Sequence, residues 1–385
     1  MIAGLFGRFI SFGVITAGVS FALSIYLAIL LGSKYAELIV IVAIINLGAN
    51  LASYGLPAKL VNTVYQISDG AFKITVYNFL RLPGKYLATL LLITLATYLM
   101  LDSITKGVLL SLVCCLGGVL INLANYYRAK KMINHFGFIM LFHSIFFPTM
   151  IAFGMDNIEA ILALFACQLI LIICILRHEM LSVEKIHKSV TYEKIDLSII
   201  TFNTVLLSLQ TSIDKMYCAK LFDNIIASDY ARASLTLTSF FLMANIFANF
   251  YTTILPKLIE ENRLNRFWKL MNLGVVFILP IVTLCFIYIN QVYFINPIPN
   301  IVYILFCFCG ALLINVKFFF GILFFQDRAK IILRSTFLFF TAFAVMSIGI
   351  TSVWHISLVV AFSFVFQLLY LAYSYESPTN NLILS

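Results

Sequence analysis

Charged residues are scarce in this sequence, and their scarcity excludes a soluble domain. Asp, Glu, Lys and Arg make up 11% of the 385 residues, whereas a soluble domain usually carries about 25% to cover its surface. Hydrophobic residues make up 62%, and the mean hydropathy is +1.03. We therefore expect lipid, and not water, to cover most of the surface of this chain.

The sequence also lacks the signatures of several enzyme classes. It has no glycine-rich phosphate-binding loop of the P-loop type, which excludes ATP hydrolysis by this chain. Its eight cysteines fall in or at the ends of apolar runs without the paired spacing of metal ligands. We therefore expect inert thiols and no metal site. The polar stretches between apolar runs are too short for an outer catalytic domain or an inner nucleotide-binding domain.

The apolar runs predict an all-α membrane protein with about twelve spans. A spanning helix needs roughly 20 apolar residues, and the run from Phe9 has no clear small-residue cleavage site, so we expect it to be the first span and not a removed signal peptide. The predicted spans are residues 9–31, 38–55, 86–104, 107–126, 136–154, 158–176, 197–218, 230–252, 270–289, 300–325, 331–352 and 356–373.

The basic residues orient these spans. Eighteen of the 25 Lys and Arg fall in five alternate loops, and only four fall in the loops between them. Basic residues accumulate on the cytoplasmic side of membrane proteins, so we expect both termini to be cytoplasmic. This pattern also explains the net charge of +9 without a nucleic-acid partner.

The two halves of the sequence resemble each other. Residues 33–57 and 228–256 share a Ser-x-Tyr-Ala motif and a pair of asparagines before a Leu-Pro, which are Asn46 and Asn50 in the first half and Asn245 and Asn249 in the second. We infer a duplication into residues 1–190 and 191–385, each a six-helix bundle. Six spans per half give both halves the same orientation, so we expect two pseudo-symmetric bundles around a central cavity.

Two pairs of motifs resemble a known family. Leu31–Ala36 leads into a span that closes with Tyr54–Pro57, and Ser212–Lys215 is followed by Asp229–Ala233 at the start of span 8. These residues resemble the O-antigen and polysaccharide flippase branch of the multidrug/oligosaccharidyl-lipid/polysaccharide (MOP) exporter superfamily.

The resemblance implies a transporter of the bacterial inner membrane and not an enzyme. Such a flippase moves an undecaprenyl-diphosphate-linked oligosaccharide from the cytoplasmic to the outer leaflet by alternating access, within membrane lipid. It needs no cofactor, with H⁺ or Na⁺ as possible coupling ions, and a polysaccharide polymerase and a chain-length regulator are the partners implied. A cation-coupled multidrug exporter of the same superfamily is the alternative, followed by a membrane polysaccharide polymerase.

Charges within the predicted spans are the candidate cavity residues. A charge at the centre of a spanning helix costs at least about 2.5–3.5 kcal/mol, so it usually faces a cavity or a partner. Lys317 in span 10 and Arg232 in span 8 either line the cavity or extend to the membrane surface. Arg8 either contacts substrate or anchors the first span on the cytoplasmic side.

The remaining candidates have two interpretations each. Lys215 is a further candidate for the substrate-binding cavity, and Asp214 is the candidate for cation coupling. Asp214 either pairs with Lys215 or Arg232, or both residues lie in the outer interface. The four asparagines of the repeat motif either contact sugar or join helices by hydrogen bonds. Pro148 and Pro280 fall inside spans, where each predicts a kink or a hinge.

Overall fold

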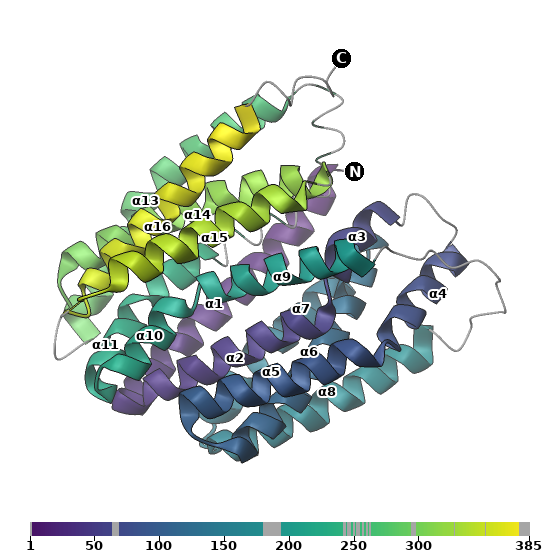
Figure 1. Cartoon of the computed structure of the whole chain (residues 1–385), viewed down its shortest axis with the longest axis horizontal. Coiled ribbons are helices and arrows are strands. Elements are labelled where there is room, and N and C mark those ends of the chain that lie inside the picture. Colours follow the sequence, from purple (N-terminus) through teal and green to yellow (C-terminus); the bar gives the residue numbers. More distant parts are fainter. Residues whose placement is uncertain are drawn as a thin grey trace. The chain divides into compact units, whose positions relative to one another are not determined.

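The structure is a computed structural model, and it describes residues 2–63, 69–179, 194–241, 244, 248, 251, 255, 258, 261, 263–293, 298–326, 328–350 and 352–376. No β-strand occurs among these residues, so the prediction of an all-helical chain is confirmed there (Figure 1). Nine stretches in the same ranges are long and apolar enough to cross a membrane. The first of them, Gly18–Ser53, joins most of the predicted span 1 to most of the predicted span 2.

The chain divides into two compact units, Met1–Ser212 and Ile213–Ser385. The first unit contains α1 (Ile2–Leu31), the 3₁₀ turn η1 (Gly32–Lys34), α2 (Tyr35–Ser53), α3 (Leu56–Thr63), α4 (Asp69–Leu80), α5 (Pro83–Leu101), α6 (Ile104–Ala129), α7 (Ile133–Ala152), α8 (Asn157–Glu179) and α9 (Lys194–Gln210). The second contains α10 (Ile213–Leu221), α11 (Asn224–Ala233), α13 (Leu264–Tyr293), α14 (Asn300–Phe325), α15 (Ala329–Ser347) and α16 (His355–Glu376).

The helices follow the predicted spans closely in both units. Spans 1 to 6 correspond to α1, α2, α5, α6, α7 and α8, and spans 9 to 12 correspond to α13, α14, α15 and α16. The predicted span 8 begins in α11 and continues in helical residues 235–241, 244, 248 and 251, while its other residues up to 252 lie outside the described ranges, apart from the turn at Ser234. Pro148 and Pro280 lie inside α7 and α13, as expected.

Two features differ from the expectation. The predicted span 7 is two helices, α9 and α10, separated at Thr211 and Ser212. The Thr211 hydroxyl donates to the carbonyl of Ser208 at 2.9 Å, the kind of local bond by which a hydroxyl side chain competes with the helix ladder. The stretch between spans 2 and 3, expected to be a loop, contains the short helices α3 and α4, which are too short and too polar to signal a span.

Small residues bring α2 and α6 together in the first unit. A Cβ added to Gly118 of α6 would lie 2.4 Å from the Cβ of Ala52, and one added to Gly48 of α2 would lie 2.4 Å from the Sγ of Cys114. Small residues at helix contacts allow the close backbone approach that replaces the hydrophobic effect within a bilayer. Helix α6 also packs against α5, α7 and α8, so it is the central helix of this unit (Figure 1).

Helix α9 packs along α2 in the first unit. A Cβ on Gly55, which has φ +68°, would lie 2.9 Å from the carbonyl oxygen of Leu197, so the turn after α2 fits closely against α9.

The predicted boundary between repeats near residue 190 concerns the origin of the two halves and stays a prediction. The compact unit extends past it, to Ser212.

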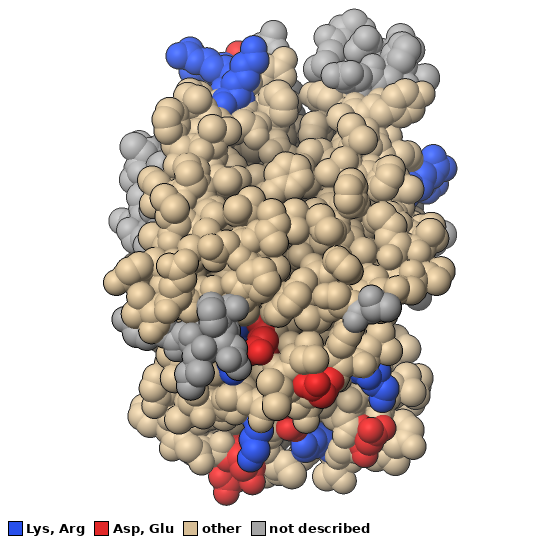
Figure 2. Space-filling view, turned by 90° about the vertical axis from the view of Figure 1, so that its left-hand side faces the viewer, with Lys and Arg blue, Asp and Glu red and all other residues tan. Residues whose placement is uncertain are grey.

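The distribution of charge agrees with a membrane environment. On the face drawn in Figure 2, charged side chains gather toward the two ends, and the broad band between them is almost free of charge. Helix α13 also carries large apolar side chains that are exposed, including Leu273, Phe277, Ile281 and Leu284. Exposed apolar residues of this size and number need lipid as their solvent.

The predicted orientation can be tested at the two ends of α13. Asn265 and Gln291 are both exposed and lie near opposite ends of the same helix. In a cysteine-free background, we expect a membrane-impermeant thiol reagent added to intact cells to label cysteine at position 291 and to spare position 265, because the basic residues place the start of α13 in the cytoplasm. Permeabilised cells, in which both positions should react, are the control. Labelling of position 265 alone in intact cells would reverse the topology.

Candidate functional site

A buried charged group forms at the junction of α10 and α11 in the second unit. Asp214 lies in the first turn of α10, where the helix dipole favours a carboxylate. Its Oδ2 accepts a hydrogen bond of 2.9 Å from the hydroxyl of Tyr230, and its Oδ1 lies 3.7 Å from the ammonium of Lys215. Asp214 is 1% exposed and Lys215 is 8% exposed. Of the two ion-pair partners expected for Asp214, Lys215 is therefore the one recorded within ion-pair distance.

Arg232 pairs within its own helix. Its Nη1 lies 2.9 Å from Oδ1 of Asp229, three residues earlier in α11. Both side chains are partly buried. Tyr303 of α14 lies close enough for the charges of Asp229 and Arg232 to act on its hydroxyl. Arg232 therefore has an anionic partner already, and its predicted contact with substrate stays a prediction.

Lys317 differs from Asp214 and Arg232 because it has no ion-pair partner among the described residues. Its ammonium lies over the ring of Phe241, 5.0 Å from the ring centroid, a distance at which a cation is attracted to the face of an aromatic ring. No carboxylate among the described residues lies within ion-pair distance of this ammonium. Lys317 is half-buried in the middle of α14, so it is an uncompensated positive charge within a predicted span.

A chain of polar side chains between α13 and α14 was not predicted. The indole Nε1 of Trp268 donates to Oδ1 of Asn315 at 2.9 Å, and Nδ2 of Asn315 donates to Oδ1 of Asn272 at 2.8 Å. These bonds join α13 to α14, and all three side chains are half-buried. The sequence did show Asn272 and Asn315 inside apolar spans. Their hydrogen bond, however, depends on how α13 and α14 are rotated about their axes, which the sequence does not reveal.

The first asparagine pair joins helices. Nδ2 of Asn50 donates to the hydroxyl of Ser208 in α9 at 2.7 Å and to the carbonyl of Asn46 at 2.9 Å. One turn further, the hydroxyls of Tyr54 and Ser198 lie 2.7 Å apart. Asn46 itself is exposed. Asn245, Asn249 and the side chain of Arg8 lie outside the described residues.

The bond between Asn50 and Ser208 predicts a measurable coupling. We expect Asn50→Ala and Ser208→Ala each to lower the thermal stability of the detergent-solubilised protein, and the double variant to lose little more than either single one. Double-mutant cycles of such bonds in membranes average about 0.6 kcal/mol. Asn46→Ala, on the exposed position, is the control. Effects of the two single variants that add fully would show that Asn50 acts elsewhere.

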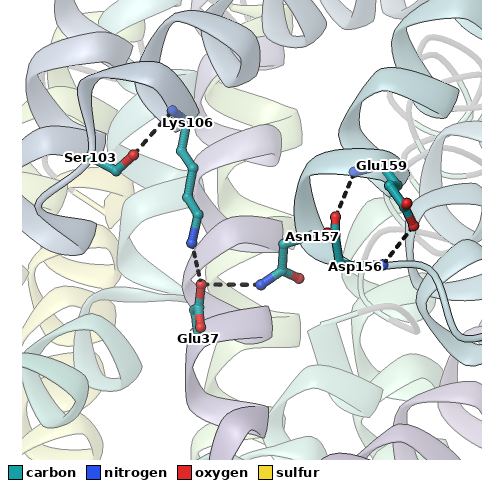
Figure 3. Close-up of polar contacts among 6 residues, drawn as sticks. All are labelled: Glu37, Ser103, Lys106, Asp156, Asn157 and Glu159. Atoms are coloured by element: carbon teal, nitrogen blue, oxygen red, sulfur yellow. Dashed lines mark hydrogen bonds and ion pairs between the residues drawn. The ribbon is translucent and has the colours of Figure 1, made fainter.

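A second polar network ties three helix ends together in the first unit (Figure 3). Oε1 of Glu37 in α2 accepts from Nζ of Lys106 at 2.8 Å and from Nδ2 of Asn157 at 3.1 Å, which connects α2 to the starts of α6 and α8. Asp156 and Glu159 then close the start of α8 by reciprocal bonds to each other's backbone amides. All of these residues lie at the end predicted to be outside, so the network stabilises that end.

Comparison with known proteins relates the fold to transporters. No protein-family model matches the chain, and no curated protein matches its sequence. Among solved structures, the eukaryotic MATE transporter AtDTX14 is similar over 99% of this chain and 95% of its own, with 10% identity and a TM-score of 0.63. The MATE multidrug transporter DinF-BH, solved in complex with rhodamine 6G, has 14% identity over 96% of both chains and a TM-score of 0.62.

A third similar structure has a different polarity. It is a transporter of the MOP superfamily from Pyrococcus furiosus, described as having a binding pocket of reverse polarity that suggests a different function. It is 13% identical, with a TM-score of 0.59, over 97% of this chain and 95% of that one. Likenesses at these identities establish the fold: this chain has the fold of MATE and related MOP transporters.

Proposed function

We propose that this chain is a secondary transporter of the MOP superfamily, which moves an amphiphilic substrate across the membrane by alternating access. The single observation that carries this proposal is the fold, shared over nearly the whole length of each transporter compared. Catalytic loops and an ATP site are missing from the sequence, which supports transport and not an enzymatic reaction.

The substrate has two candidates, and different observations favour them. The comparisons favour multidrug export, because DinF-BH is named a multidrug transporter, and they lend no support to the O-antigen branch. The uncompensated charge of Lys317 favours an anionic amphiphile, since a cation at that depth attracts a diphosphate and repels a cationic drug. The reverse polarity described for the Pyrococcus transporter supports the idea that this fold serves substrates of more than one charge.

We therefore propose an undecaprenyl-diphosphate-linked oligosaccharide as the substrate, with multidrug export as the second candidate. Each unpaired hydroxyl moved into hydrocarbon costs roughly 4–8 kcal/mol, so a few sugars cannot cross a bilayer unaided. A polar path within the protein removes most of this cost while the lipid tail stays in the membrane.

The test uses both substrates on the same purified protein. Proteoliposomes would receive either a fluorescently labelled undecaprenyl-diphosphate-linked oligosaccharide, followed by quenching from outside, or rhodamine 6G, followed by uptake. We expect the protein to accelerate flipping of the lipid-linked sugar at least about tenfold over protein-free vesicles and to leave rhodamine uptake unchanged. Movement of rhodamine alone would establish the drug exporter in place of the flippase. A protein that moves neither would overturn both.

A further inference from the structure

Three side chains of the first unit have buried polar atoms without hydrogen-bond partners among the described residues. Gln168 of α8 and Asn122 of α6 are 0% exposed, and neither atom of either amide has a partner among the described residues. The Nδ1 of His143 in α7 is also shielded and unpaired there. Buried polar groups in native proteins are almost always hydrogen-bonded, so each exception requires an explanation.

His143 and Gln168 approach the same point. A Cβ added to Gly117 of α6 would lie 3.1 Å from Cε1 of His143 and 3.7 Å from Nε2 of Gln168. All three residues are near the middle of their helices, and therefore near the centre of the membrane. Gly117 leaves room for the imidazole and the amide beside each other, and a larger residue would displace the imidazole.

No carboxylate lies at this depth in the described part of the first unit. In its long helices, carboxylates occur only near the ends, at Glu37, Glu159, Glu179 and Asp196. The helices packed against α7 are α1, α6 and α8. Their charged groups, like those of α7 itself, lie toward the ends, and the other titratable groups on these four helices are Tyr26, Cys114, Cys115, Tyr126, Tyr127, His135, Cys167, Cys174 and His178. Near the middle of these helices, His143 alone carries an imidazole, the kind of side chain that exchanges protons in the physiological range when water reaches it.

The chemistry of the pair suits a proton. A neutral imidazole nitrogen accepts a hydrogen bond, whereas a protonated one donates. The amide of Gln168 offers both a donor, Nε2, and an acceptor, Oε1, so a side-chain rotation that brings it within hydrogen-bond distance of His143 can satisfy either state of the imidazole. A metal ion such as Na⁺ is held by several oxygen ligands, and these two side chains provide only one, Oε1 of Gln168.

We propose that His143 and Gln168 form a proton-binding site that couples proton movement to transport; the proposal rests on the transporter function proposed above. Nδ1 takes a proton from water when the site opens to one side, and the imidazolium returns it to water on the other.

The test compares His143→Gln with His135→Gln in proteoliposomes that contain trapped pyranine as a pH indicator. His135 lies near the start of the same helix and stacks on Tyr127, so it is a matched control. The probe is the labelled lipid-linked oligosaccharide or rhodamine 6G, whichever the wild-type protein moves. We expect a pH gradient to accelerate wild-type and His135→Gln transport severalfold. In His143→Gln, reconstituted in the same amount and eluting like the wild type in size-exclusion chromatography, the gradient should have no effect on transport.

A second variant guards against a folding defect. Gln168→Met keeps the volume but removes the acceptor for the imidazolium, so we expect its midpoint for gradient-driven transport to move to lower pH. His143→Gln that still responds to the gradient as the wild type does would overturn the proposal. So would wild-type transport that is indifferent to the gradient, although the transporter function would then stand. A wild type that moves neither probe would remove the transporter function and this proposal together.

Discussion

Lys317→Ala is expected to reduce flipping of the lipid-linked oligosaccharide about ten- to hundredfold. The ammonium lies over Phe241 and has no carboxylate within ion-pair distance among the described residues, so none of these carboxylates would compete with an anionic group of the proposed substrate. A hydrogen bond to a charged group contributes roughly 1.5–3 kcal/mol, and its loss accounts for a change of that size. The flipping assay in proteoliposomes, with equal amounts of protein, is the measurement.

Two further variants separate charge from shape at this position. Lys317→Arg keeps the positive charge, and we expect it to retain most of the activity. Lys330→Ala removes an exposed basic residue from the start of α15 and should have no effect. If Lys317→Ala flips the oligosaccharide at the wild-type rate, the anionic substrate is wrong. If it moves rhodamine 6G faster than wild type, Lys317 restricts a drug exporter.

Asp214→Ala is expected to destabilise the second unit strongly. The change removes the acceptor of the Tyr230 hydroxyl and the carboxylate 3.7 Å from the Lys215 ammonium, all in a buried setting. Breaking a buried ion pair by removing one partner costs about 3–5 kcal/mol. At 2–4 °C per kcal/mol, the smaller figure corresponds to a decrease of roughly 6–12 °C in melting temperature.

Thermal melting of the detergent-solubilised protein, followed by size-exclusion chromatography, would measure this decrease. Asp214→Asn should lose less, because the amide oxygen still accepts from Tyr230. Asp229→Ala breaks the partly exposed pair with Arg232, and such pairs contribute about 0–1 kcal/mol, so its effect should be small. Equal melting temperatures for Asp214→Ala and Asp229→Ala would contradict the structural importance of Asp214.

The sequence was sufficient to predict the positions of the spans, because a run of about 20 apolar residues has few alternatives to a membrane helix. It did not predict the break between α9 and α10, since the apolar run continues through Thr211 and Ser212. The helices α3 and α4 were missed for the opposite reason, because they are short and carry polar residues.

The sequence indicated which charged residues lie inside apolar runs but not which partners they have. Lys317 and Asp214 were recognisable because a charge inside an apolar run is rare. That Asp214 contacts Tyr230 and Lys215, while Arg232 contacts Asp229, depends on the rotation of each helix, which the apolar pattern leaves undetermined. His143 and Gln168 were missed for the same reason: single polar residues in different spans become a site only when α6, α7 and α8 pack.

The contact between α2 and α9 affects how the first unit is made. Asn50 and Ser208 are separated by 158 residues, and ribosomes add roughly 5–20 residues per second. After α2 has been synthesised, the amide of Asn50 therefore waits roughly 8–30 s, at that rate of synthesis, for the hydroxyl that it bonds in the finished protein. During this interval the nascent chain exposes a polar helix face inside the membrane, where a membrane chaperone or a quality-control protease can recognise it. A ribosome that stalls before α9 emerges leaves a chain that cannot complete this unit.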